Sequence, residues 1–163
     1  MATSTEVAIA TTTLGSAAST ITFSSIPSTY TDLRLVLTGA VAGNDVYFRF
    51  NGDTATNYSA TYLGGNGTSA YSGSQTNFAS SYAGSLNTST PSMITLDTFS
   101  YAGSTYKTTL TTGSQDNNGS GGTIRIAALW RSTSAITSLS LIGGTGASNN
   151  FTVGTTATLY GIL

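Results

Sequence analysis

Apolar and polar residues alternate along two short segments of the chain, residues 33–38 and 46–50. A period of two places successive side chains on opposite faces of a β-strand, so one face of each segment would enter a core. Arg34, Tyr47 and Arg49 fall on the other faces, which we expect to be exposed. The connection between the segments contains Gly, Asn and Asp, which favour turns. The pattern therefore predicts that these two strands pair as a hairpin.

Eight further segments cluster Thr, Val, Ile, Tyr and Phe between Gly, Asn and Ser residues, whereas strong helix formers are scarce. About ten short strands separated by turns favour an all-β fold, an antiparallel β-sandwich of the jelly-roll type, because two sheets can each bury one alternating face. The length suits a single domain over residues 1–163, with a short N-terminal arm over about residues 1–6. The eight further predicted strands cover residues 7–14, 20–26, 58–63, 93–99, 106–112, 123–130, 136–142 and 157–162.

The same alternation indicates which side chains form the core. Trp130 ends a predicted strand, and we interpret it as a core anchor rather than a platform on which a sugar stacks. The last predicted strand is too apolar to be left in solvent, so it should be an integral core strand. The core residues predicted in this way are Leu35, Leu37, Phe48, Phe50, Ile124, Ile126 and Leu159.

Residues 64–91 differ in composition from the rest of the chain, since Gly, Ser, Asn and Ala predominate around isolated aromatic residues. We interpret this stretch as a long surface excursion with marginal strand content. The alternative is a projecting loop that contacts a partner, because long connections in compact domains often carry function.

The amino-acid composition excludes several common kinds of catalytic and metal-binding site. Charged residues make up 7% of the chain, His and Cys are absent, and there are 24 Ser and 32 Thr. Without Cys there is no disulfide, thiolate nucleophile or cysteine zinc site, and without His the usual general base is missing. A Ser or Thr nucleophile would depend on Lys107 or an acidic residue for activation, and the acidic residues show no local pairing. We therefore expect no enzyme activity and no cofactor.

Two oxygen-rich segments, residues 116–122 and 51–53, contain the hard ligands that calcium prefers. Neither has the spacing of an EF-hand or a nonapeptide calcium repeat, and Asn, Asp and Gly are also the residues that tight turns require. The turn interpretation is favoured, so no metal site is predicted.

The formal net charge of −1 is too small to attract phosphate backbones, so nucleic acid is not an expected partner. No stretch approaches the roughly 20 apolar residues of a membrane-spanning helix, so we expect no membrane partner. Residues 1–15 lack the basic and apolar regions of a classical export signal, and the absence of Cys fits a reducing compartment. Synthesis in a cytoplasm is therefore expected.

A small set of side chains is predicted to face outward from the sheets. One interpretation is that they are solvated residues that limit edge pairing and aggregation. The other is an interface, because Arg and Tyr are enriched where protein surfaces meet and charge is otherwise sparse here. The candidate interface residues are Arg34, Tyr47, Arg49, Arg125 and Arg131.

Several blocks of the chain, taken in order, resemble a group of small β-rich virion proteins of tailed bacteriophages, including phages of cyanobacteria. The likeness extends from about residue 7 to the end, and the order of the blocks is more informative than any one of them. The blocks are 48–53 with Asn57 and Tyr58, 118–122, 129–139 and 157–162.

That group includes head decoration (cement) proteins and tail-fibre components, so the resemblance implies a virion protein made in a bacterial cytoplasm. The chain is short for a whole fibre and has no heptads, so a decoration protein on the outer head surface is favoured over a tail-fibre or receptor-binding module. The implied partners are the major capsid protein and other copies of this chain, with which it would form a trimer. The alternative implies a host surface glycan.

Overall fold

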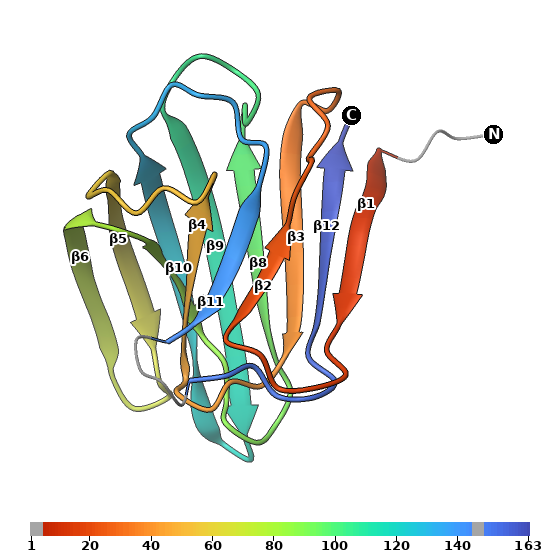
Figure 1. Ribbon diagram of the computed structural model, residues 1–163. Coiled ribbons are helices and arrows are strands. Elements are labelled where there is room, and N and C mark those ends of the chain that lie inside the picture. Colours follow the sequence, from red (N-terminus) through yellow and green to blue (C-terminus); the bar gives the residue numbers. More distant parts are fainter. Residues whose placement is uncertain (1–4, 145–148) are drawn as a thin grey trace.

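The computed structural model describes residues 5–144 and 149–163, which contain strands and no helix (Figure 1). Two antiparallel sheets pack face to face in a sandwich-like arrangement, so the predicted all-β class is confirmed. The larger sheet has the order β1 (Glu6–Thr13), β12 (Thr156–Ile162), β3 (Asp32–Gly39), β8 (Ser92–Phe99), β9 (Lys107–Asn117), β10 (Ser120–Trp130), β5 (Tyr58–Gly65) and β6 (Ala70–Phe78). The smaller sheet has the order β2 (Thr20–Phe23), β11 (Leu139–Gly143), β4 (Asp45–Phe50) and β7 (Ser81–Ser85).

The two sheets differ in width, and this difference positions the candidate sites. The larger sheet has eight strands and the smaller has four. Figure 1 shows β4, β11 and β2 in front of the middle of the larger sheet, with β5 and β6 on one side and β12 and β1 on the other. The larger sheet therefore extends past the smaller one on both sides, and part of its inner face is not covered by a strand.

Alternating burial along the strands produces the core between the sheets. In β3 and β4 every second side chain is buried, as the sequence pattern requires. All seven predicted core residues are buried, and Trp130 is 3% exposed, so its interpretation as a core anchor is confirmed. The last strand, β12, lies between β1 and β3 and contributes Ala157 and Leu159 to the core.

The predicted hairpin between residues 33–38 and 46–50 is wrong. Strand β3 pairs with β12 and β8 in the larger sheet, whereas β4 pairs with β11 and β7 in the smaller one. The connection crosses the core edge, where Val41 is buried and forms a bridge with Phe151. Alternation shows that each strand buries one face, but two such faces can meet across a core as well as along an edge.

The prediction of marginal strand content for residues 64–91 is also wrong, because this stretch contains β6 and β7. Strand β6 is exposed along most of its length, so it has no apolar alternation to reveal it. Strand β7 enters the core with small residues, Ala83 and Gly84, rather than with large apolar ones. Strands predicted at 20–26 and 136–142 also prove shorter, as β2 and β11.

Both oxygen-rich segments form turns. Asn118 and Gly119 have φ values of 54° and 89° and join β9 to β10 in a tight hairpin, with Asp116 Oδ1 accepting the Gly119 amide. Asn51 and Gly52 likewise have positive φ, and the Asn51 side chain bonds to the backbone of residues 135, 137 and 138. Local backbone geometry thus accounts for both compositions.

The N-terminal region enters the larger sheet early. Residues 1–4, most of the predicted arm, lie outside the described residues, whereas Glu6 begins β1 and pairs with Ile162. Within residues 5–144 and 149–163, no helix has the length and apolar character needed to cross a membrane.

An aromatic cluster fills one end of the core. The Phe50 ring centroid lies 5.1 Å from that of Phe48 and 5.5 Å from that of Trp130, and Tyr58 stacks on Trp130 at 6.4 Å. Tyr58 Oη accepts the Phe50 amide at 2.9 Å. Such ring pairs add stability beyond the area they bury.

Asp53 connects this aromatic cluster, through hydrogen bonds, to the surface turn that precedes β5. Its Oδ2 accepts hydrogen bonds from the Trp130 indole N–H at 2.7 Å and from the Asn57 side-chain Nδ2 at 2.8 Å, and its Oδ1 accepts one from the Ala55 backbone N–H at 2.9 Å. Burial raises the pKa of the carboxyl, but these hydrogen bonds to its charged form outweigh burial and lower the pKa below its ordinary value.

Replacing Asp53 by Asn is therefore expected to lower the free energy of unfolding at pH 7 by about 1.5–3 kcal/mol, because one amide oxygen cannot replace a carboxylate accepting three hydrogen bonds. A carboxyl with a lowered pKa in the fold stabilises above its unfolded pKa, and this contribution disappears as the pH falls through the folded pKa. Urea unfolding at several pH values should thus show the two proteins converging in acid. The turn variant Asp116→Asn serves as the control, and an Asp53→Asn effect independent of pH would contradict the assignment.

Candidate functional site

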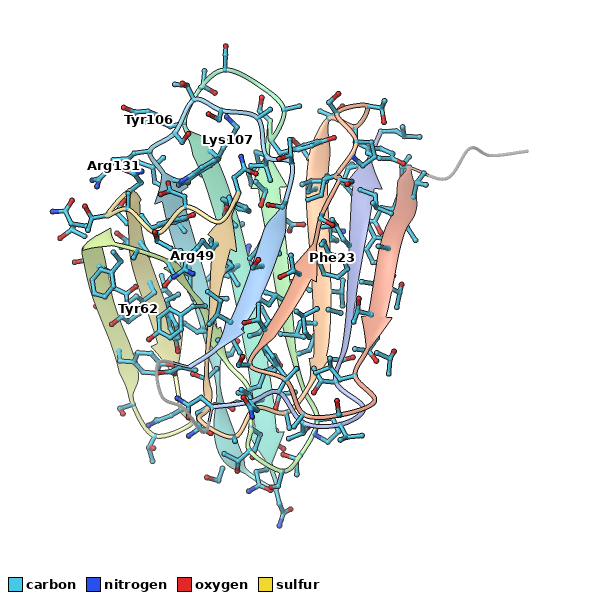
Figure 2. All side chains as sticks on the ribbon, viewed as in Figure 1. Phe23, Arg49, Tyr62, Tyr106, Lys107 and Arg131 are labelled. Atoms are coloured by element: carbon cyan, nitrogen blue, oxygen red, sulfur yellow. The ribbon has the colours of Figure 1, made fainter. Side chains whose placement is uncertain are left out.

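The five predicted interface residues do not form one patch. Arg34 and Arg125 project from the outer face of the larger sheet, because their neighbours along β3 and β10 are buried. Tyr47 and Arg49 project from the face of the smaller sheet that points away from the core. Arg131 follows β10 at the end of the sandwich (Figure 2). Any single interface can therefore include only some of them.

Two of these arginines donate hydrogen bonds to other parts of the same chain. Arg49 Nε donates to the Ala79 carbonyl at 2.9 Å, which connects β4 to the turn between β6 and β7. Arg131 Nη2 donates to Asn77 Oδ1 at 2.8 Å and also to the Thr56 carbonyl, which connects the end of β6 to the turn before β5. Both side chains are partly buried and hold the β6 region in place.

The positive charge of Arg34 is balanced by two carboxylates on the same face of the larger sheet. Its Nε lies 2.6 Å from Asp97 Oδ1 and its Nη1 lies 2.5 Å from Glu6 Oε1. The hydrogen bond to Asp97 and the nearby negative charges raise the pKa of the guanidinium despite its partial burial. This triad links β1, β3 and β8, so it leaves little free positive charge for a partner.

Lys107 is fully buried, and its ammonium group is directed at backbone carbonyls. Its Nζ donates to the carbonyls of Gly103, at 2.7 Å, and Thr105, and burial lowers its pKa. In the part of the chain that the structure describes, no three acidic side chains converge on a point where a metal ion could bind.

The first candidate surface is the outer face of the larger sheet, opposite the core. Strand pairing aligns its outward side chains in rows across the sheet, and threonine predominates in them. Thr11 and Thr158 hydroxyls lie 3.1 Å apart, and those of Thr13 and Thr156 lie 2.9 Å apart. We call this surface the outer threonine face. Its two threonine-rich rows are Thr13, Thr156, Thr38, Met93, Ser114 and Thr123, and Thr11, Thr158, Val36, Thr95, Thr112, Arg125 and Leu63.

The outer threonine face presents methyl and hydroxyl groups with few free charges. Arg125 is exposed and donates to Thr112 Oγ1 at 3.1 Å. Large apolar side chains are also exposed there, with Leu63 at 65% and Met93 and Phe99 at 43% each. A surface of this kind can pack against another protein with little cost in desolvated charge.

The second candidate surface is a pocket where the β5–β6 hairpin meets β7, the edge strand of the smaller sheet. The cavity measures about 280 Å³. We call it the tyrosine pocket, and Figure 2 labels Tyr62 in this region. Its lining comprises Asp45, Tyr47, Tyr62, Tyr71, Gln75, Tyr82 and Ile124.

Two of the tyrosines lie over glycines of the neighbouring strand. Tyr62 pairs with Gly73 and Tyr71 pairs with Gly64 across the β5–β6 ladder. A Cβ atom at Gly73 would lie 2.5 Å from Tyr62 Oη, and one at Gly64 would lie 2.6 Å from Tyr71 Cζ. Only glycine leaves room for these rings against the sheet, so the pairs create an aromatic floor on its inner face.

Polar groups line the side of the tyrosine pocket. Tyr82 Oη lies 2.7 Å from Ser85 Oγ, which donates to Asp45 Oδ1 at 3.1 Å. Gln75 Oε1 is buried and has no hydrogen-bond partner. Burial raises the pKa of Tyr82 to about 12 and also raises that of Tyr47.

Sequence reasoning found only Tyr47 of this pocket. Tyr71, Gln75 and Tyr82 were not singled out because they lie in the stretch interpreted as a surface excursion, and Tyr62 lies in the predicted strand 58–63 without a candidate role. A usable signal was the repeated Tyr-x-Gly spacing at 62–64 and 71–73, which places each Tyr opposite the other strand's Gly in an antiparallel pair.

No family model and no curated protein matches the chain.

Proposed function

We propose that this protein is a non-catalytic structural component of a bacteriophage virion, a decoration protein that binds the outer head shell and stabilises it. The order of the sequence blocks that resemble small phage virion proteins supports the setting. The observation that carries the mode of action is the outer threonine face, a wide sheet surface with exposed apolar side chains and few free charges. The proposed partner is the major capsid protein.

We also propose that the sandwich is a jelly roll extended by two hairpins. Strands β1, β12, β3 and β8 are neighbours in one sheet, and β2, β11, β4 and β7 make up the other. Within this set, the chain alternates between sheets from β1 to β4, as in a jelly roll. The hairpins β5–β6 and β9–β10 then widen the larger sheet. Jelly rolls occur in viral capsid and lectin domains, which supports the virion setting by analogy alone.

A decoration protein acts by mass action rather than by chemistry. It binds the assembled lattice across neighbouring subunits and not the separated ones, so it shifts the equilibrium toward the intact shell. Contacts made by methyl and hydroxyl groups are screened little by salt, so binding should change little between low and high ionic strength. Repeated subunits on a shell favour a symmetric oligomer, and we propose a homotrimer.

Adding the purified protein to undecorated expanded heads is expected to raise the temperature at which the heads release their genome. Thr95→Glu should weaken binding at least about tenfold, because Thr95 lies between Val36 and Thr112 on the outer threonine face and a buried unpaired carboxylate is costly. The matched control, Thr22→Glu on the exposed face of the smaller sheet, should bind as the unmodified protein does. Binding and genome release are followed by sedimentation and by dye-detected melting.

Absence of binding, or binding without a rise in the release temperature, would reject the decoration role. The second candidate, a receptor-binding module of the tail, is favoured by one observation, the tyrosine pocket with its aromatic lining. Binding to host cells rather than to heads would support that alternative.

A further inference from the structure

We propose that the tyrosine pocket is a binding site for a neutral oligosaccharide. The proposal goes beyond the shell-binding role and does not depend on it, because the two surfaces lie on opposite faces of the larger sheet. Along β5, Tyr62 points to the inner face, whereas Thr61 and Leu63 point to the outer threonine face. A ligand in the pocket would leave the outer face free.

The aromatic floor supplies the apolar part of such a site. Tyr62 and Tyr71 lie over Gly73 and Gly64, and Tyr71 remains 43% exposed, so its ring is open to a ligand. The Tyr82 ring stands against this floor, 6.0 Å from Tyr62 at an interplanar angle of 69°. One face of a pyranose ring presents mostly C–H groups, and a tyrosine face is a suitable surface against which to bury them.

Hydroxyl groups of a sugar need hydrogen-bond partners at the edge of that apolar contact, and the pocket provides both acceptors and donors. Asp45 and the buried Gln75 Oε1 are acceptors, and Gln75 Oε1 has no partner within the chain. Among the described residues, the Tyr62 and Tyr71 hydroxyls have no intramolecular hydrogen bond, so both can donate or accept. A buried acceptor without a partner is costly, which favours a ligand hydroxyl at this position.

The charge of the lining selects against anionic ligands. Asp45 is the one charged side chain that lines the pocket, and no Lys or Arg lies among the lining residues. Sialic acids, uronic acids and sulfated sugars would place a negative charge near this carboxylate without a cation to balance it. The pocket is therefore suited to uncharged sugars.

A second, polar hollow lies beside the tyrosine pocket and shares Asp45 with it, so a bound ligand can extend beyond one sugar. A small cavity shares Tyr71 and Tyr82 with the tyrosine pocket, and it shares Ser85 and Gln115 with this second hollow, which measures about 440 Å³. Amide side chains predominate in that hollow, and Asn and Gln can both donate to and accept from hydroxyls. The second hollow is lined by Asn44, Asp45, Ser85, Asn87, Gln115, Asn117, Ser120 and Gly121.

Saturation-transfer NMR and calorimetry with maltohexaose, cellohexaose and chitohexaose test this proposal, with hexagalacturonate as the anionic probe. At least one neutral hexaose is expected to bind with a dissociation constant between about 10 μM and 1 mM. Tyr71→Ala should weaken binding at least tenfold, which corresponds to about 1.4 kcal/mol. The matched control is Tyr106→Ala, because Tyr106 is 54% exposed and lies away from the pocket, in the loop before β9 (Figure 2).

Gln75→Met separates a binding role from a structural one. The substitution removes the unpartnered amide oxygen at similar volume, so thermal stability should be unchanged or higher while saccharide affinity falls about fivefold or more. A purely structural Gln75 would not produce this split.

Three results would overturn the proposal. They are the absence of binding by every neutral hexaose, equal binding by Tyr71→Ala and Tyr106→Ala, and a preference for hexagalacturonate. Each leaves the head-binding result unaffected, since Thr95→Glu addresses the other face of the sheet.

Discussion

Replacing Phe50 by Ala is expected to lower the free energy of unfolding by about 3–5 kcal/mol. Phe50 is fully buried, and its ring packs against both Phe48 in its own strand and Trp130 in the opposite sheet. The substitution removes the transfer free energy of the ring and leaves a cavity between two sheets whose strands are held by ladder hydrogen bonds. Because the backbone cannot collapse into this space, the loss should lie toward the upper part of the range.

Urea unfolding monitored by Trp130 fluorescence and far-ultraviolet circular dichroism would measure this effect. Phe99→Ala is the matched control, because Phe99 is 43% exposed on the outer threonine face and its loss should change stability by less than about 1 kcal/mol. Equal midpoints for Phe50→Ala and the unmodified protein would show that the β4 side chains do not carry the core.

Alkaline unfolding is the second large effect expected, because four tyrosines are held neutral by the fold. Tyr58 is fully buried, and burial raises its pKa far above the ordinary value. Burial raises the pKa of Tyr82 to about 12 and also raises the pKa values of Tyr47 and Tyr101. In the unfolded chain each of these phenols ionises near pH 10.

A phenol with a raised pKa in the fold stabilises fully below its unfolded pKa, and this contribution is lost as the pH rises through the folded pKa. Above pH 10, each tyrosine that is ionised in the unfolded chain but neutral in the fold lowers the free energy of unfolding by about 1.4 kcal/mol per pH unit. Lys107 acts in the opposite direction, because its lowered pKa increases stability as the pH approaches 10.5. Several tyrosines oppose one lysine, so the net effect is destabilisation.

Denaturation curves from pH 8 to about pH 11.5, together with the ultraviolet absorbance of tyrosinate, would test this expectation. Tyr58→Phe is the informative variant: it should be less stable at pH 7, because the Phe50 amide loses its acceptor, yet should lose less stability above pH 10. Ionisation of all nine tyrosines near pH 10 in a protein that remains folded would contradict the role assigned to burial.

Much of the core could be predicted from the sequence, because a strand that buries one face has apolar residues at every second position. The alternation along 33–38, 46–50 and 123–130 placed the core side chains correctly, since the pleat fixes the direction of each side chain relative to its neighbour. The interpretation of Trp130 followed from the same pattern. The composition is likewise known without the tertiary structure, and the lack of His and Cys narrows the chemistry available to the protein whatever its fold.

Strand partners and the tyrosine pocket were decided only by the tertiary structure. Alternation says that β3 and β4 each bury a face, but it does not say that those faces meet across the core instead of along a shared edge. Strand β6 lies beyond the smaller sheet, so its inner face is lined by Tyr71, Gly73 and Gln75 instead of apolar residues, and the local signal of a strand is absent. Pairing depends on contacts between residues far apart in the chain, and these contacts also bring Tyr47 and Tyr82 of the smaller sheet against the β5–β6 hairpin.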